Sequence, residues 1–268
     1  MGLTKNEIMM KIEENGLQGK IICLHSSLKS FGEIEGGIKS IVDAFLEANC
    51  TLIVPTFTYE CETSQPAERR IERNGYDDHA TFDHAAAFDL DKRMISTEMG
   101  AIPKYIIHEE QCYRSEHPLN SFAAIGKKAK EIISKQTFLN VYGHYKYIYE
   151  MEESYLILAG VGLNSATPIH YAEERAGRVL FRRWAKHKDN ETIEVEVGSC
   201  SEGFPNMEKC VEGIKTEDIV GNSHWDIFKF KPFIDEITEA IINDNEITKC
   251  EDSHCPRCKD AIAGGPIL

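Results

Sequence analysis

Apolar and polar positions in the first sixty residues follow the order helix, strand, helix, strand. A capping-box pattern opens the first predicted helix, over residues 4–16. Apolar runs at residues 20–25 and 51–55 predict two buried strands, and helical spacing over residues 38–46 predicts the helix between them. This order indicates parallel strands joined by crossover helices, as in α/β proteins.

The pattern changes after the second strand. Residues 59–98 are charged, polar and without a regular period, which predicts a long surface excursion. Farther along the chain, we predict helices at 127–134 and 169–176 and strands at 155–162 and 192–197. The sequence has no internal repeat, and we predict that residues 1–268 form a single α/β domain.

The composition is that of an acidic globular protein. Hydrophobic residues make up 42% of the 268 residues, and no apolar run approaches the ~20 residues of a membrane helix. The formal net charge is −14, from 30 basic and 44 acidic residues. Nucleic acid needs a basic surface, so we predict no nucleic-acid partner and no membrane partner. A small cation is the more natural ligand for a protein of this charge. The alternative is that the acidic composition only keeps the protein soluble.

The cysteines indicate a reducing compartment. There are nine, an odd number without the spacing of a disulfide framework, and the N-terminus shows no signal core. We therefore predict a cytoplasmic location. Cys255 and Cys258 form one C-x-x-C pair with Cys250 and His254 nearby. A structural zinc, a redox pair and incidental cysteines all remain possible interpretations. The last is favoured because no second pair exists, and we predict no metal requirement.

Polar residues follow three of the predicted strands. His25, Ser26 and Ser27 come after the first, residues 56–58 after the second, and glycines at 160–162 lead toward a later helix. Ligands of α/β proteins bind at such strand ends. The phosphate-loop, dinucleotide-binding, H-E-x-x-H and G-x-S-x-G motifs are absent from the sequence. Their absence disfavours kinases, dinucleotide oxidoreductases, zincins and serine hydrolases.

Two histidines are candidate catalytic residues, and each also has an ordinary structural interpretation. His170 lies three and four positions before Glu173 and Glu174, so a helix would place either carboxylate on the face of the imidazole. The same spacing is common in solvated pairs on helix surfaces. His117 precedes Pro118 and is typical of a turn residue.

Taken together, the segments of the chain resemble the aminoglycoside 3-N-acetyltransferases, also called the antibiotic N-acetyltransferase family. The similarity is collinear over nearly the whole chain and is carried by residues 25–32, 35–37, 51–58, 99–103, 114–126, 158–162 and 167–173. The resemblance implies a mixed central sheet flanked by helices, in a fold peculiar to this family and distinct from the GNAT fold. It also implies acetyl-CoA as co-substrate and an amine of the 2-deoxystreptamine ring of aminoglycosides as acceptor.

The resemblance also implies roles for particular residues. His170 matches the family histidine that acts as general base, and such catalysis typically contributes ~10² to 10⁴ in rate. Backbone amides near Ser26 and Ser27 are expected to stabilise the oxyanion. Hydroxyls and cations suit the pantetheine and phosphates of CoA. The segments similar to the CoA groove contribute His25, Ser26, Ser27, Lys29, Arg114, His117 and Ser121.

The sequence departs from the family pattern in its acidic residues. Relatives orient the base with carboxylates from a later segment, for which Glu194, Glu196 and Glu202 are candidates here, with Glu173 as the local alternative. Asn164 stands where many relatives carry Asp. A non-aminoglycoside amine as acceptor, or a CoA-binding protein without catalysis, therefore stays open as an alternative. We expect the protein to act as a monomer or homodimer.

Overall fold

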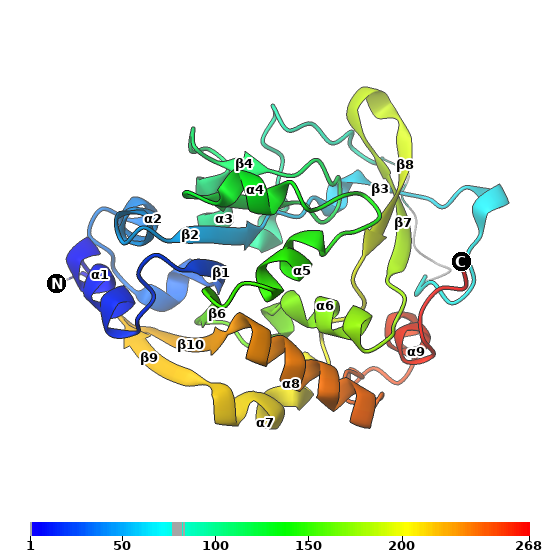
Figure 1. The fold of residues 1–268 in the computed structure, drawn as a ribbon. Coiled ribbons are helices and arrows are strands. Elements are labelled where there is room, and N and C mark those ends of the chain that lie inside the picture. The colour runs from blue at the N-terminus through cyan, green and yellow to red at the C-terminus, as the bar shows by residue number, and fades with distance from the viewer. Residues whose placement is uncertain (1, 77–81, 83) are drawn as a thin grey trace.

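The first helix and the first two strands form where the hydrophobic pattern predicts them. The computed structural model describes residues 2–76, 82 and 84–268, and Figure 1 shows its fold. Helix α1 (Lys5–Glu14) opens with the predicted capping box, in which Thr4 and Glu7 bond each other's backbone amides. Strands β1 (Ile21–Ser26) and β2 (Thr51–Pro55) pair in parallel, which confirms the predicted crossover.

The central sheet has seven strands and is mixed, as predicted. Its order is β4-β5-β2-β1-β6-β10-β9. Strands β2, β1 and β6 are parallel, whereas the outer pairs are antiparallel. The remaining strands are β4 (Tyr113–Arg114), β5 (Phe122–Ile125), β6 (Ser154–Ala159), β9 (Thr216–Val220) and β10 (Ser223–Lys229).

Helices cover both faces of this sheet. On one face, α1 packs with α2 (Ile38–Glu47) and α3 (Ala101–Ile106) over a core that contains Ile22 and Leu24 of β1. Ile21 and Cys23 point to the opposite face, because neighbouring strand residues alternate. The helices on that face are α4 (Ala129–Ile133), α5 (Gly143–Tyr149), α6 (Pro168–Arg175), α7 (Glu208–Val211) and α8 (Phe230–Asn243).

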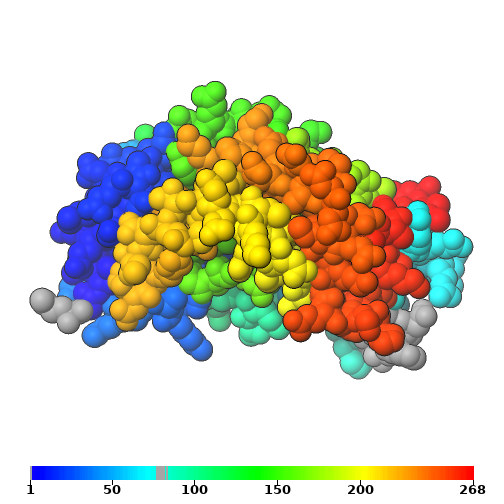
Figure 2. Space-filling view, turned by 90° about the horizontal axis from the view of Figure 1, so that it is seen from below, coloured from blue at the N-terminus to red at the C-terminus, as the bar shows by residue number. Residues whose placement is uncertain are grey.

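Helix α8 is the longest helix of the described chain, and it is not among the helices predicted from the sequence. Its buried side chains include Phe233, Ile234, Ile237 and Ile241, which recur at helical spacing. Figure 2 shows α7 and α8 side by side on the lower face, between the N-terminal and the C-terminal segments. Within the described residues, the helices are all too short or too polar to cross a membrane.

A second sheet of three antiparallel strands stands beside the first. It consists of β3 (Glu62–Thr63), β7 (Phe181–Lys186) and β8 (Thr192–Val197), in that order. Helix α9 (Pro256–Ile262) packs near it, as Figure 1 shows. Single-turn 3₁₀ helices lie at Leu28–Phe31, Tyr59–Cys61, Ala67–Arg69, Thr97–Met99, Leu163–Ser165, Lys188–Asn190, Phe204–Met207 and Glu212–Ile214.

The predicted surface excursion at 59–98 has buried anchor points on this small sheet. Phe88 is 2% exposed and joins a core cluster with Phe181. The side chain of Asn74 bonds the backbone of Arg182, accepting from its amide at 2.7 Å and donating to its carbonyl at 2.8 Å. Residues 77–81 and 83 of the excursion lie outside the described residues. Tyr59, Glu62, Tyr76 and Glu98 of the excursion line a cleft at the ends of the central strands.

Candidate active site

A cleft of about 620 Å³ opens at the carboxyl ends of β1, β2 and β6. The backbone turns sharply after β6 at Gly160, whose φ is +68°. A side chain at this position would also meet Ser30, since a Cβ there would lie 2.2 Å from the Ser30 side chain. Side chains that line the cleft include His25, Ser26, Phe57, Tyr59, Glu62, Tyr76, Glu98, Asn164, His170, Arg183, Ser199, Glu202 and Arg257.

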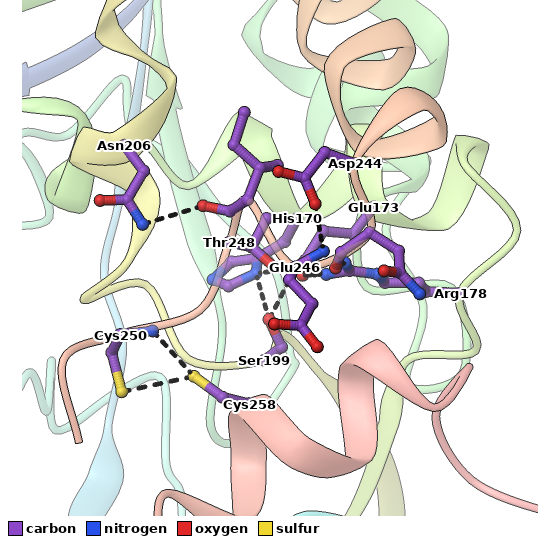
Figure 3. Close-up of polar contacts among 12 residues, drawn as sticks. His170, Glu173, Arg178, Ser199, Asn206, Asp244, Glu246, Thr248, Cys250 and Cys258 are labelled. Atoms are coloured by element: carbon purple, nitrogen blue, oxygen red, sulfur yellow. Dashed lines mark hydrogen bonds and ion pairs between the residues drawn. The ribbon is translucent and has the colours of Figure 1, made fainter. Parts of the chain in front are cut away.

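His170 projects into this cleft from α6 and is tied to a buried carboxylate. Its Nδ1 lies 2.7 Å from Oε2 of Glu173, one helical turn farther on. The same oxygen accepts a hydrogen bond from Ser199 Oγ at 2.7 Å. The other oxygen accepts from Arg178 Nη1 at 2.6 Å. Figure 3 shows the four side chains converging from three segments of the chain. The His170–Glu173 pair is therefore buried. It is not the solvated pair on a helix surface that was the alternative interpretation of this spacing.

The surroundings of Glu173 favour its charged form. Burial, at 1% exposure, raises the pKa of this carboxyl. Hydrogen bonds from His170 and Ser199, together with the charges of His170 and Arg178, outweigh burial and hold the pKa below its ordinary value. An ionised carboxylate is an acceptor only, so the imidazole must donate from Nδ1. The neutral ring then carries its lone pair on Nε2.

The position of the imidazole is also fixed by close packing. The ring of Phe204 meets it edge-on, with 4.9 Å between the ring centroids. Tyr142 stacks on it at 6.0 Å. Gly198 approaches so closely that a Cβ there would lie 2.5 Å from His170 Cδ2 and 2.6 Å from the Tyr142 hydroxyl. Only glycine leaves both rings undisturbed.

Glu196, the other predicted partner of the base, is held elsewhere. Its Oε1 accepts from Arg182 Nη1 at 2.8 Å, and its Oε2 accepts from the backbone amide of Val141 at 3.2 Å. Residues 194 and 196 point to the same side of β8 because strand residues alternate, and Glu194 also pairs with Arg182. The carboxylate that contacts His170 is thus the local one, Glu173, and not one from β8.

The residues predicted from the end of β1 divide into two groups. His25 and Ser26 line the cleft, and burial lowers the pKa of His25 to about 3, which keeps its ring neutral. The backbone amide of Ser27 donates to Ala159 O at 2.9 Å. The hydrogen of the Ser27 amide is therefore already used, and the prediction that backbone amides near Ser26 and Ser27 stabilise the oxyanion stays a prediction for the neighbouring amides. Lys29 is exposed in the 3₁₀ turn that follows.

Arg114, His117 and Ser121 lie in the neighbouring β4–β5 region and not on the wall of the main cleft. Arg114 Nη2 donates to Thr56 O at 2.6 Å, and Ser121 Oγ donates to the same carbonyl at 2.7 Å. The ring of His117 lies 2.9 Å from Glu196 O and accepts from the amide of Asn120, which is typical of a turn residue. Burial lowers the pKa of His117 to about 4. Arg114 and His117 line a separate hollow of about 350 Å³.

Several residues that line the cleft were not predicted from the sequence, because distant segments of the chain supply them. Tyr76 and Arg183 come from the excursion and β7, and the guanidinium lies 4.3 Å from the centre of the tyrosine ring. Arg183 also pairs with Glu62 at 3.2 Å. Ser199 and Arg257 also line the cleft, and Arg257 Nη2 donates to Ser199 O at 3.1 Å. No periodicity in the sequence marks these residues, because only the packing of the small sheet and α9 brings their segments together.

These features define an α/β enzyme with a histidine–carboxylate pair in a cleft at strand ends. Residues 23–241 match the model of the aminoglycoside 3-N-acetyltransferase family. The chain belongs to this family of acyltransferases, and the predicted resemblance is confirmed.

Known relatives agree with this assignment. The chain is 23% identical to the SPbeta prophage-derived aminoglycoside N(3')-acetyltransferase-like protein YokD of Bacillus subtilis (strain 168), over 90% of this chain and 93% of that one. It is 28% identical to aminoglycoside N(3)-acetyltransferase III of Salmonella sp, over 69% of this chain and 65% of that enzyme.

Solved structures show the same fold. Aminoglycoside acetyltransferase AAC(3)-IVa superposes with a TM-score of 0.77 at 20% identity, covering 98% of both chains. A histidine-to-alanine mutant of that enzyme is known in complex with a gentamicin. The fold is therefore that of the family and not the GNAT fold.

Proposed function

We propose that this protein transfers the acetyl group of acetyl-CoA to the 3-amino group of the 2-deoxystreptamine ring of aminoglycosides and so confers resistance to them. The observation that carries the proposal is the His170–Glu173 pair, buried on one side and open to the cleft on the other. Family membership supports acetyl-CoA as donor, and the gentamicin complex of AAC(3)-IVa supports this class of acceptor.

In the proposed mechanism, acceptor and donor meet in one ternary complex. Nε2 of His170 takes a proton from the acceptor amine as its nitrogen attacks the thioester carbon. The new C–N bond forms, the C–S bond breaks, and the CoA thiolate leaves and receives the proton that the His170 imidazolium gives up, which restores the neutral base. Glu173 stabilises the imidazolium that forms on His170, since it stays ionised one hydrogen bond away. This mechanism requires no covalent acyl-enzyme.

The walls of the cleft suit a polycationic sugar. Glu98 and Glu202 line it and offer negative charge to ammonium groups, in a chain whose formal net charge is −14. Tyr59 presents an aromatic surface on which sugar rings and cations pack. These groups are all supplied by the excursion or by the segment after β8.

A second acceptor class has one observation in its favour. Asn164, which lines the cleft, replaces an aspartate that the family pattern leads us to expect, so one negative charge is missing there. An amino sugar with fewer ammonium groups than an aminoglycoside fits such a cleft. A non-catalytic CoA-binding protein is disfavoured, because its premise is a missing carboxylate partner, and Glu173 fills that role geometrically.

The experiment is a thiol-release assay with acetyl-CoA and a panel of 2-deoxystreptamine aminoglycosides and simpler amino sugars. We expect turnover with the aminoglycosides and a fall of about 10² to 10⁴ in kcat for His170→Ala. His108→Ala is the matched control, since His108 is exposed, its ring contacts the Lys104 carbonyl, and it is not among the residues that line the cleft. Turnover on amino sugars alone would favour the second class, and full activity of His170→Ala would refute the mechanism.

A further inference from the structure

Four cysteine thiols from three separate segments meet beside the cleft. Cys200 follows β8, Cys250 follows α8, and Cys255 and Cys258 begin α9. Their sulfur atoms all lie within 4.8 Å of one another. None of the four is in a disulfide. Sequence spacing groups only the last three, and the fold adds Cys200 from the distant segment after β8.

The spacing of the sulfurs suits one tetrahedral ion. A Zn–S bond of ~2.3 Å places the four sulfurs of a tetrahedral site about 3.8 Å apart. The sulfurs of Cys250 and Cys258 are 3.4 Å apart, so small side-chain rotations bring the set to that geometry. A disulfide needs ~2.05 Å and would join only two of the four. A complete Cys₄ set leaves no open position for substrate, which is the character of a structural site.

Backbone amides already point at the sulfurs. The amide of Cys258 donates to the Cys255 sulfur at 3.5 Å, and the amide of Cys250 donates to the Cys258 sulfur at 3.4 Å. Thiolate ligands gain from such donors, because four thiolates carry more negative charge than a divalent ion neutralises. Arg257 lies between Cys255 and Cys258 in the sequence, and its guanidinium donates to the carbonyl of Ser199, the residue before Cys200, at 3.1 Å.

We propose that Cys200, Cys250, Cys255 and Cys258 bind one structural zinc ion. The ion ties the segment after β8 to the C-terminal helix. That segment carries Ser199, which bonds the Glu173 carboxylate at 2.7 Å, and Gly198, which packs on His170. Figure 3 shows Cys250 and Cys258 beside Ser199, to its left. The zinc site therefore holds the wall of the cleft against which the histidine–carboxylate pair is positioned.

The first test measures the metal in the full chain as purified without chelator. We expect about one zinc per chain by inductively coupled plasma mass spectrometry, and less than about a fifth of that in Cys200→Ser and Cys258→Ser. Cys112→Ser and Cys210→Ser are matched controls, because these half-buried thiols lie outside the cluster. Both controls should keep the metal.

A second measurement avoids dependence on variants that fail to fold. Zinc is removed from the wild type under reducing conditions, and CoCl₂ is added. We expect the intense visible bands of cobalt in a tetrahedral thiolate site, and their loss when ZnCl₂ is added. Zinc-free protein as purified that also gives no cobalt bands would overturn the proposal, and so would a Cys250–Cys258 disulfide found by mass spectrometry in the purified chain. These readouts do not depend on acetyl transfer.

The positioning role rests on the proposed function and has its own readout. Removing the zinc should lower kcat for thiol release at least about tenfold and leave KM for acetyl-CoA within about threefold, and adding zinc back should restore kcat. Unchanged kcat in the zinc-free enzyme would overturn this role of the ion while the metal measurements still decide whether the site exists. An enzyme with one zinc and no activity on any amine would instead refute the proposed function.

Discussion

Replacing Glu173 by glutamine should disable the base by reversing its tautomer. The carboxylate accepts from His170 and Ser199 on one oxygen and from Arg178 on the other. A glutamine that keeps its carbonyl oxygen toward the buried arginine must turn its amide N–H toward Nδ1 of His170. The imidazole then has to accept at Nδ1 and carry its proton on Nε2. The atom that takes the proton from the amine is no longer a base.

The size of the effect follows from this geometry. A wrong tautomer removes most of the contribution of the general base, so we expect kcat/KM to fall about 10² to 10⁴, or about 3 to 5 kcal/mol of transition-state stabilisation. The free energy of unfolding should fall by only about 1 to 3 kcal/mol. Arg178 limits the loss, because it keeps hydrogen bonds to Thr248 Oγ1 at 2.8 Å and to Asn245 O at 2.5 Å.

The assay is thiol release from acetyl-CoA with the best acceptor of the panel, together with urea unfolding followed by circular dichroism. The double variant with His170→Ala tests the route of the effect. If Glu173 acts only through the imidazole, the double variant should be no slower than His170→Ala alone. Glu174→Gln, one position farther on the same helix and exposed, is the control. Activity of Glu173→Gln within about threefold of wild type would refute the reasoning, as would losses that multiply in the double variant.

Two further predictions concern packing and pH. Gly198→Ala should lower kcat at least about tenfold with an unchanged circular dichroism spectrum, since its Cβ would lie 2.5 Å from His170 Cδ2, and wild-type kcat would contradict it. Burial lowers the pKa of His25 and His144 to about 3 and of His117 to about 4. The unfolded chain binds these protons below about pH 6.5 and the folded chain does not. The contribution of the neutral histidines to the free energy of unfolding is therefore fully present above that pH and falls on acidification toward about pH 3 to 4. His144→Leu should flatten this fall by about 1.4 kcal/mol per pH unit in urea titrations, and an unchanged slope would refute a neutral His144.

Local patterns account for the elements that the sequence predicted well. Residues that are neighbours along the chain decide a capping box, a buried strand or a helical stripe, so α1, β1, α2 and β2 formed close to the predicted bounds. Helix α6 belongs to the same class, and its geometry places Glu173 beside His170 without any help from distant segments. Helix α8 carries an equally local signal in its helically spaced apolar residues, although no helix was predicted there.

Contacts between distant segments account for what the sequence left open. The spacing within α6 places Glu173 beside His170, but nothing local shows that Glu196 is held elsewhere. That follows because β7 pairs with β8 and brings Arg182 to Glu196. The same applies to Ser121, which matches the family motif for the CoA groove and is buried against the Thr56 carbonyl. Sheet register decides both cases.

The sequence by itself determined the parallel core of the fold, the family and the histidine at the centre of the site. Each of these depends on periodicity, on collinear motifs or on residues one helical turn apart. Only the tertiary structure decided which carboxylate holds His170 in place, which predicted residues face the cleft, and that Cys200 joins three cysteines from the end of the chain. The physical reason is that these partners are chosen by the packing of two sheets and α9, which pair segments separated by many residues.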